Sequence, residues 1–459
     1  MKNGAKKAAI VLLTLAVMAP TVWGGGNKAA SGSTGKSEAI RDLGGITITI
    51  GNWWSDFDVE TREANSTTEQ KVIDWRRKIQ QEGNFKMTEK NVSSWGEMAQ
   101  VAATSIISGS PVADVIILQP NWALALYNQG LLYPASDNKT VDFSVTTPVP
   151  WTKSVLDAFT FGGKAYAFSP EGTGGSQHES GVYFNKRLFE EAGLAPDLPY
   201  DMQKAGTWTW AAFLDICKKL TRDTNNDGIT DTYALATLST ETLDAIAASN
   251  GANFVIKDAA GKFVNGTGTP AFLEALQYSV RLNNEGVLMP QPANSNWDWF
   301  KAAFHDGRAA MRVDETYVGQ ELRDMADDWG YVFFPKGPRA SDYLTVSDEN
   351  VFVIPSTVSA ADVDKIMYAV KLWYTPVDDQ PDAWKDSLYN IYRDDRAINE
   401  TRTMMRDPKY STWKNVNMIP GLERGNIAWN MWNEGQDPAQ LIESVSQNWN
   451  YTIGEANPK

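Results

Sequence analysis

The run Asp114-Val115-Ile116-Ile117-Leu118 contains four consecutive apolar side chains, without the alternation expected of a strand that faces water on one side. A continuous apolar run of this length is typical of a parallel strand covered on both faces. The segments before it are predicted to be strands at residues 46–50 and 85–92, and helices at residues 68–81 and 95–108. The order strand, helix, strand, helix, strand predicts a doubly wound α/β fold.

The rest of the chain continues this alternation. Further strands are expected at residues 163–168, 182–184, 309–313, 331–334 and 351–354. Helices are expected at residues 186–192, from Thr269 and Pro270 to residue 282, at residues 299–305, and through most of the C-terminal quarter. No obvious linker interrupts residues 45–459, so we expect lobes interwoven by several chain crossings.

Another helix is expected after Thr207, its predicted N-cap. Its apolar face carries Phe213, Ile216, Cys217 and Leu220. Cys217 is the only cysteine, so the chain cannot form an internal disulfide. We interpret Cys217 as a small core residue, with a reactive thiol as the alternative.

The composition is that of a soluble globular protein. The chain has 459 residues, of which 42% are hydrophobic and 21% charged, and its formal net charge is -14. The length is sufficient for two or three domains with a sizeable core. The acidic excess argues against a nucleic-acid partner or an anionic membrane surface, because both require clustered Lys and Arg.

The N-terminus predicts export. Lys2, Lys6 and Lys7 precede the apolar run from Ala8 to Ala19, which is too short to span a bilayer. We assign residues 1–24 to a signal peptide and residues 25–44 to a flexible tether. The protein is expected in the periplasm or on the outer side of the cell envelope, without a lipid anchor, because no cysteine stands near Gly24 to receive the lipid.

Residues 223–231, with the sequence DTNNDGITD, place oxygen-bearing side chains at alternate positions around a glycine. An EF-hand-like Ca²⁺ loop needs such a pattern, with a backbone carbonyl at position 7 and a glycine at position 6. The predicted ligands are Asp223, Asn225, Asp227, the Ile229 carbonyl and Asp231. Position 12 is Ala234 rather than Glu, so an ordinary EF-hand is not expected, and a solvated turn is the alternative.

Ordered motifs resemble a known family. Residues 162–167 (GGKAYA), 182–189 (VYFNKRLF) and 192–194 (AGL) closely resemble a segment of bacterial ABC-importer sugar-binding proteins. Four further stretches agree in the same order, namely Thr207-Trp208 and residues 304–311, 335–338 and 353–356. The resemblance, to family 1 of the extracellular solute-binding proteins, covers about residues 45–375. The 223–231 loop looks like one found in alginate-binding and related oligosaccharide-binding members.

The resemblance implies a two-lobed periplasmic-binding-protein fold of type II, with a ligand cleft between hinge-linked lobes. By this resemblance residues 45–170 and 315–347 form the N-lobe, and residues 171–314 and 348–459 the C-lobe. Hinge crossings are expected near residues 169–180, 312–316 and 347–350. The acidic pairs Asp314-Glu315 and Asp348-Glu349 either hydrogen-bond the ligand or set the hinge.

Aromatic residues suggest what the cleft binds. The chain has 18 tryptophans, and sugars present C–H faces to aromatic rings while their hydroxyls seek carboxylates and amides. Open α/β sheets bind ligands at the carboxyl ends of their strands, so most ligand-binding candidates are taken from there. The candidates are Trp53, Trp54, Asp56, Trp122, Glu171, His178, Glu179, Asp314, Asp348 and Trp429. Trp429 and Trp432 are also compatible with packing, and Trp208 is expected to be structural.

Catalysis is the competing interpretation. Glycoside hydrolysis needs two positioned carboxyl groups, but the chain has 56 acidic residues, so their presence discriminates little. The two histidines, His178 and His305, have no partner at metal-ligand spacing in the sequence. We therefore expect a non-enzymatic, monomeric receptor that captures an oligosaccharide by hinge closure, carries a structural Ca²⁺ and serves an ABC-transporter permease. The alternatives are a secreted carbohydrate-active enzyme and a receptor of the same fold for peptides or polyamines.

Overall fold

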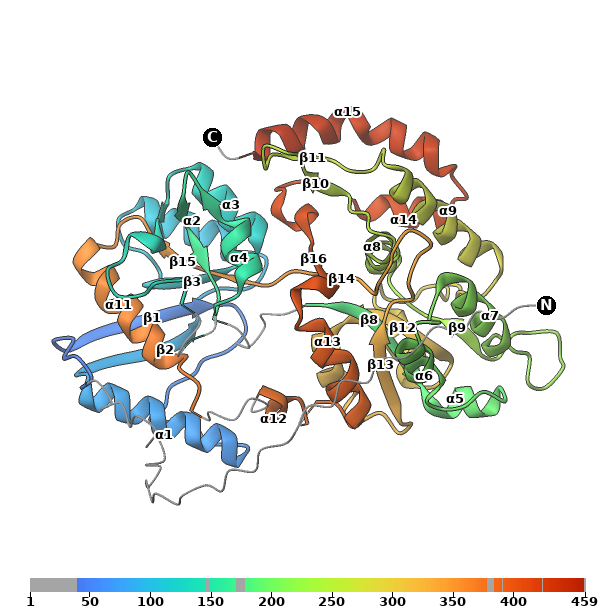
Figure 1. Cartoon of the computed structure of the whole chain (residues 1–459), viewed down its shortest axis with the longest axis horizontal. Helices are drawn as coiled ribbons and strands as arrows, with labels where there is room; N and C mark the ends of the chain where they lie inside the picture. The colour runs from blue at the N-terminus through green and yellow to red at the C-terminus, as the bar shows by residue number, and fades with distance from the viewer. Residues whose placement is uncertain are drawn as a thin grey trace, which may run out of the picture. The chain divides into compact units, whose positions relative to one another are not determined.

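Figure 1 shows the computed structural model, which describes residues 39–145, 149, 151–170, 178–377, 384–389, 391–422 and 424–457. Contacts group Arg41–Lys459 into one unit, and that unit is described below. The predicted signal peptide at 1–24, residues 25–38 of the predicted tether and Glu171 lie outside the described residues.

The first sheet has the strand order β2-β1-β3-β15-β4, and β7 also pairs with β15. Its strands are β1 (Ile46–Asn52), β2 (Phe85–Asn91), β3 (Val115–Leu118), β4 (Leu132–Tyr133), β7 (Ala167–Phe168) and β15 (Val351–Pro355). β1 runs parallel to β2 and to β3, whereas β15 is antiparallel to β3. All four residues of β3 are buried, which confirms the expected strand covered on both faces.

Helices surround this sheet. They are α1 (Thr67–Glu82), α2 (Met98–Ile107), α3 (Pro120–Asn128), α4 (Lys153–Ala158) and α11 (Ala360–Trp373). α1 ends before Gly83, as predicted. α11 comes from far along the chain and packs beside α1 (Figure 1). There Trp75 donates its Nε1–H to the Leu372 carbonyl at 2.8 Å.

The second sheet has the strand order β13-β8-β12-β9. Its strands are β8 (Ser180–Asn185), β9 (Tyr233–Leu235), β12 (Ala309–Glu315) and β13 (Trp329–Phe333). β8 is antiparallel to both β12 and β13, and β12 is parallel to β9. The helices between these strands are α5 (Lys186–Glu191), α6 (Leu198–Ala205), α7 (Trp210–Leu220), α8 (Ser239–Ser249), α9 (Pro270–Asn284) and α10 (Trp299–His305).

Helix α7 is capped by Thr209, not by the predicted Thr207. Trp208 is fully buried and donates its Nε1–H to the Phe333 carbonyl at 2.8 Å, so the chain enters the helix only after this anchor. The structural assignment of Trp208 is thereby confirmed. All four residues of the expected apolar face are buried, and Cys217 is a fully buried free thiol whose burial raises its pKa, as a core residue requires.

Smaller elements complete the unit. Three two-stranded sheets are formed by β5 (Thr160–Phe161) with β6 (Lys164–Ala165), β10 (Val255–Lys257) with β11 (Phe263–Asn265), and β14 (Thr345–Ser347) with β16 (Ser411–Trp413). The C-terminal helices are α12 (Trp384–Leu388), α13 (Thr403–Met405), α14 (Gly425–Asn433) and α15 (Pro438–Ala456). Short turns of other helix types are η1 (Ala135–Asp137), η2 (Thr316–Leu322), η3 (Ala397–Arg402), η4 (Pro408–Tyr410) and η5 (Asn415–Met418).

Strand pairing corrects the predicted lobe boundaries. The sequence assigns residues 315–347 to the N-lobe, but β13 lies in the second sheet beside β8. It assigns residues 348–459 to the C-lobe, but β15 lies in the first sheet beside β3. Both β12 and β13 flank β8, so the chain stays in the second sheet and the expected crossing at 312–316 is wrong.

Three other connections link the two sheets. The chain passes from β7 to β8, within the predicted segment 169–180, and from β14 to β15, within the predicted segment 347–350. A further crossing lies between α11, which packs on α1, and η3, which packs on β13. The expectation of interwoven lobes is confirmed, with the last crossing later in the chain than predicted.

Candidate ligand-binding site

Four tryptophans gather where the parallel strands of the first sheet end. Trp53 and Trp54 follow β1, Trp95 follows β2, and Trp122 lies in the first turn of α3, after β3. The ring centroids are 4.9 Å apart for Trp53 and Trp54, 5.4 Å for Trp53 and Trp122, and 5.8 Å for Trp95 and Trp122. Trp54 is 39% exposed and Trp95 57%. This tryptophan cluster therefore presents aromatic surface at the edge where open α/β sheets bind ligands.

Asn52 fixes the turn that carries Trp54. Its side chain is fully buried at the end of β1, and its Oδ1 accepts the backbone N–H groups of Trp54 and Ser55 at 2.9 and 3.0 Å. Its Nδ2 donates to the Ser55 carbonyl at 2.9 Å. An Asn side chain that closes a turn in this way holds the backbone in one conformation, so the backbone position of Trp54 is fixed.

A polar pocket lies along the start of α3 and the crossing from β14 to β15. Its volume is about 250 Å³, slightly below the range of roughly 300–1,000 Å³ common for small-molecule sites. It is lined by Gln119, Pro120, Asn121, His178, Asp348, Glu349, Asn350, Val416, Asn417, Ile419, Gly421, Leu422 and Arg424. The first three residues immediately precede Trp122, so the pocket and the tryptophan cluster share one helix start.

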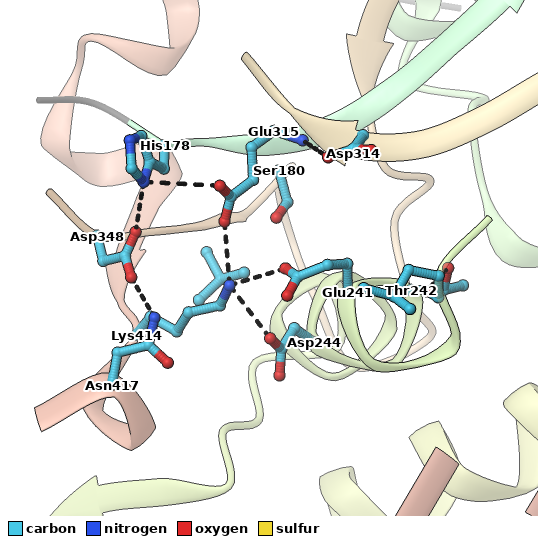
Figure 2. A network of polar contacts seen from close by, with 12 residues as sticks. His178, Ser180, Glu241, Thr242, Asp244, Asp314, Glu315, Asp348, Lys414 and Asn417 are labelled. Atoms are coloured by element: carbon cyan, nitrogen blue, oxygen red, sulfur yellow. Dashed lines mark hydrogen bonds and ion pairs between the residues drawn. The ribbon is translucent and has the colours of Figure 1, made fainter. Parts of the chain in front are cut away.

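A buried network of charges is centred on Lys414, as Figure 2 shows. Several of its members line one side of the pocket. The Lys414 side chain is only 2% exposed. Its Nζ lies 2.9 Å from Glu241, 3.2 Å from Asp244 and 3.2 Å from Glu315. Arg424 lies 2.7 Å from Asp244 and so adds a second cation. We call these residues, together with His178, Asp348 and Asn417, the Lys414 network.

His178 connects this network to the pocket. Its Nδ1 lies 3.3 Å from the Asp348 carboxylate and 3.6 Å from that of Glu315. Asn417 donates its Nδ2–H to the other oxygen of Asp348. His178 thus bridges two carboxylates from two different strand ends, directly at the crossings between the sheets.

Comparison with protein families identifies the chain. Residues 88–375 match the family model described as bacterial extracellular solute-binding protein. The chain belongs to the bacterial extracellular solute-binding proteins. No curated protein sequence matches it significantly. Among the described residues, no helix of this solute-binding protein is long and apolar enough to cross a membrane.

Solved structures share its two-lobed fold. The cyclic α-maltosyl-1,6-maltose binding protein of Arthrobacter globiformis has a TM-score of 0.64 at 16% identity, covering 89% of this chain and 99% of its own. The ABC substrate-binding protein of Listeria monocytogenes in complex with cycloalternan has a TM-score of 0.61 at 17% identity, and the match covers 89% of this chain and 99% of that protein. UgpB of Mycobacterium tuberculosis, in complex with glycerophosphocholine, has a TM-score of 0.62 at 16% identity, and the match covers 89% of this chain and 98% of that protein. The predicted type of fold is therefore confirmed.

Burial and charge shift the pKa values in the Lys414 network. Burial alone would lower the pKa of His178, but its hydrogen bond to Asp348 and the charges of Glu315 and Asp348 raise the pKa to about 9. Burial raises the pKa of Glu315 to about 8, against the opposing effect of Lys414 and His178. For Asp348, burial is outweighed by His178 and Lys414, and its pKa falls below the usual range. His178 is therefore protonated at neutral pH and Asp348 ionised.

The structure corrects one statement about histidine. The sequence shows no metal-ligand spacing around His178, yet the fold brings ligand atoms of His178, Glu315 and Asp348 within 4.8 Å of one another. The sequence spacing does not reveal this grouping, because the three residues lie on separate elements. A protonated imidazole is no metal ligand, and the Lys414 ammonium 3.2 Å from Glu315 repels a second cation. The three residues are best understood as an ion-pair bridge.

Two of the predicted ligand-binding carboxylates are buried and form hydrogen bonds to other protein groups. Glu179 is 3% exposed, and its carboxylate accepts hydrogen bonds from Arg402 at 2.8 Å and from Thr316 at 3.0 Å. Asp314 is 8% exposed and accepts from Arg312 Nε at 2.8 Å. Glu179 thus joins η2 and η3 to the start of β8, whereas the contact of Asp314 lies within its own strand.

The other predicted positions divide into surface and core. Asp56 is exposed and caps the end of β2 by accepting the Asn91 backbone N–H at 2.7 Å. Trp429 is 43% exposed on α14, the helix that follows Arg424. Trp432 instead donates its Nε1–H to Ser279 at 2.8 Å, which favours the packing interpretation for that residue.

Sequence reasoning missed part of the site. Trp95 follows a predicted strand in the same way as Trp53, so the rule about strand ends would have found it. Nothing local signals Lys414, which meets Glu241 and Glu315 only through the fold. Asn417 and Arg424 likewise reach the pocket from segments without a motif.

The predicted calcium loop has a defined shape. Asp223 accepts the backbone N–H groups of Asn226 and Gly228 at 2.7 and 2.8 Å, and Asp231 accepts that of Thr224 at 2.7 Å. Gly228 has φ +87°, the left-handed conformation that the turn position requires. Asp231 thus joins the two ends of the loop, and Asp223 closes its first turn. The donor set of carboxylate, amide and carbonyl oxygens fits Ca²⁺.

Proposed function

We propose that this solute-binding protein captures a carbohydrate, of oligosaccharide size, and delivers it to the membrane permease of an ABC importer. The observation that carries the proposal is the tryptophan cluster beside a polar pocket. Two of its rings, Trp54 and Trp95, face solvent at the strand ends of the first sheet. Aromatic faces bind the C–H surfaces of sugar rings, and the amide and charged groups of the neighbouring pocket bind hydroxyls.

Hinge closure supplies the mechanism. One part of the pocket lining comes from the start of α3, which follows β3 of the first sheet. Another part comes from η5 and the loop after it, in the C-terminal segment that follows β16. A ligand that contacts both sets gains its full binding free energy only in the closed conformation, so it shifts the population towards closure. The protein acts as a monomeric receptor and performs no chemistry on the sugar.

The 223–231 loop binds Ca²⁺ as a structural ion in this proposal. It follows α7 directly and lies apart from the residues that line the pocket. Export by a cleaved leader places the protein outside the cytoplasmic membrane, where free Ca²⁺ is available to such a loop.

A saccharide panel read by thermal unfolding tests the function. A ligand that binds only the native state raises its apparent stability, by about 2.7 kcal/mol at a hundredfold excess over Kd. The expected result is saturable stabilisation by at least one saccharide, which chromatography then recovers unchanged. Release of new reducing ends would indicate a carbohydrate-active enzyme, and stabilisation by peptides alone would indicate a non-sugar receptor.

A further inference from the structure

Glu349 stands apart from the other carboxylates of the pocket. It lines the pocket, yet it is only 3% exposed. Its Oε1 makes no hydrogen bond of good geometry among the residues that the structure describes, and the donors beside it are the neutral hydroxyls of Ser169 and Thr152. A buried carboxyl group that faces hydroxyls but no paired cation is incompletely compensated, so on a pocket wall it points to a missing cationic ligand group.

The charges around the pocket do not balance. Other buried carboxylates nearby are matched one to one, as in the Glu179–Arg402 pair at 2.8 Å. The pocket and the Lys414 network contain three cationic side chains, His178, Lys414 and Arg424. They face five carboxyl groups, those of Glu241, Asp244, Glu315, Asp348 and Glu349. Two carboxyl groups are therefore left without a cation.

The pKa values agree with this count. Burial raises the pKa of Glu349 to about 8, and the charge of Glu179 adds to this rise. Hydrogen bonds from the Ser169 and Thr152 side chains and the charge of His178 act in the opposite direction. Glu315 is the other carboxyl group with a pKa of about 8. Both hold a proton at neutral pH in place of the missing cation. Of the two, only Glu349 lines the pocket.

We propose that the pocket binds the ammonium group of an organic solute, with the Glu349 carboxylate as its counter-ion. The inference rests on the proposed carbohydrate function and narrows it, because it makes the ligand an amino sugar rather than a neutral saccharide. On binding, the Glu349 carboxyl group loses its proton to solvent and the ammonium group takes the place of that proton. The charge of the complex is then compensated.

The two cations on the pocket wall do not prevent this. The positive charge of His178 is paired with the ionised Asp348 carboxylate, and that of Arg424 with Asp244. Amide side chains such as Asn121 and Asn350 complete the lining and suit sugar hydroxyls. The small volume of the pocket, about 250 Å³, fits one substituted ring end, with the remaining rings against the tryptophan cluster.

Calorimetric titration at pH 7 in two buffers of different ionisation enthalpy tests the proposal. The probes are the β-1,4 disaccharide of glucosamine, its N-acetylated form, maltose, putrescine and Ca²⁺. We expect the amine disaccharide to bind about 10–100-fold more tightly than its acetylated form, as the loss of a hydrogen bond to a charged group predicts. We also expect it to release protons, which the buffer dependence measures.

Glu349→Gln keeps the shape of the protonated side chain and so should fold. It should reduce the affinity for the amine disaccharide about 10–100-fold and abolish proton release. Glu82→Gln, at an exposed position at the end of α1, is the charge-matched control and should change none of these quantities.

The outcomes separate this inference from the function on which it rests. Equal binding of acetylated and amine disaccharides, or an unchanged affinity in Glu349→Gln, overturns the ammonium site and leaves carbohydrate capture intact. Tight binding of putrescine alone keeps the ammonium site and overturns carbohydrate capture. Binding of Ca²⁺ that depends on Glu349 would make the site a metal site, and no binding of any probe would overturn both proposals.

Discussion

The tryptophan cluster and the Lys414 network offer a solute two different kinds of surface at neighbouring places. The tryptophan cluster is apolar and partly exposed, and each of its rings can be removed without leaving a charge behind. The Lys414 network is buried, and each of its charged members depends on a partner of opposite charge. We therefore expect changes in the cluster to act on ligand affinity, and changes in the network to act first on the stability of the fold.

Removing Lys414 should have the largest effect. In Lys414→Met the carboxylates of Glu241, Asp244 and Glu315 lose the cation that lies within 3.2 Å of each. Breaking a buried ion pair from one side costs about 3–5 kcal/mol. Chemical denaturation should show this loss in the free energy of unfolding.

Lys409→Met is the matched control, because Lys409 is 60% exposed and its pair with Asp407 spans 3.5 Å. A solvent-exposed ion pair contributes little to stability, so the control should remain near the wild type. Equal stability of the two variants would show that the carboxylates around Lys414 are neutralised by protons instead.

The pH dependence of stability should be the next largest effect. The pKa of His178 is raised from 6.5 to about 9, so its contribution is fully present below pH 6.5 and is lost as pH rises through about 9. The shift corresponds to about 3 kcal/mol. Asp348 and Glu315 raise this pKa, and Lys414 lowers it. The pKa values of Glu315 and Glu349 are raised from 4.5 to about 8. Their contribution to stability is therefore also lost as pH rises between these two values.

The free energy of unfolding should therefore fall as pH rises from about 4.5 to 9. Measured by denaturant titration, His178→Gln should flatten the fall above pH 6.5. His305→Gln, at a side chain that is 37% exposed, should not. A wild-type stability that is constant over this range would contradict the charge arrangement of the Lys414 network.

These two regions also differ in how far the sequence predicts them. Trp53, Trp54 and Trp122 follow strands that periodicity identifies, so the topology rule for open α/β sheets locates them from the sequence alone. The network joins positions 178, 241, 315, 348 and 414, and no local pattern relates them. Only the sheet order brings them together.

The lobe boundaries illustrate the same limit. The sequence predicts both β13 and β15 close to where they lie, but period and composition do not tell which sheet a strand joins. Antiparallel pairing with β8 places β13 in the second sheet, and pairing with β3 places β15 in the first. Local structure follows from short-range side-chain preferences, whereas sheet assignment depends on partners more than a hundred residues away.

Truncating an exposed ring of the tryptophan cluster should have an intermediate effect, confined to binding. Trp54→Ala and Trp95→Ala each remove a stacking surface, and we expect a loss of affinity for the bound saccharide of about 1.5–3 kcal/mol. Thermal unfolding without ligand should change little, because Trp54 is 39% and Trp95 57% exposed.

Trp297→Ala is the control for these variants, since Trp297 is 71% exposed and lies outside the cluster. Titration calorimetry should find its affinity unchanged. If Trp54→Ala and Trp95→Ala bind as tightly as Trp297→Ala does, the sugar does not lie on the tryptophan cluster.

Removal of Ca²⁺ should have the smallest effect on binding, because the 223–231 loop belongs to neither region. Chelation should lower the melting temperature of the protein, since an ion that binds only the native state stabilises it by mass action. Saccharide affinity should stay within about twofold, because mutations at well-separated sites act independently. Asp223→Asn should reproduce the effect of chelation on stability and make the protein insensitive to further chelator. A loss of affinity without a loss of stability would instead place the ion in the pocket, where it would compete with the ammonium group for Glu349.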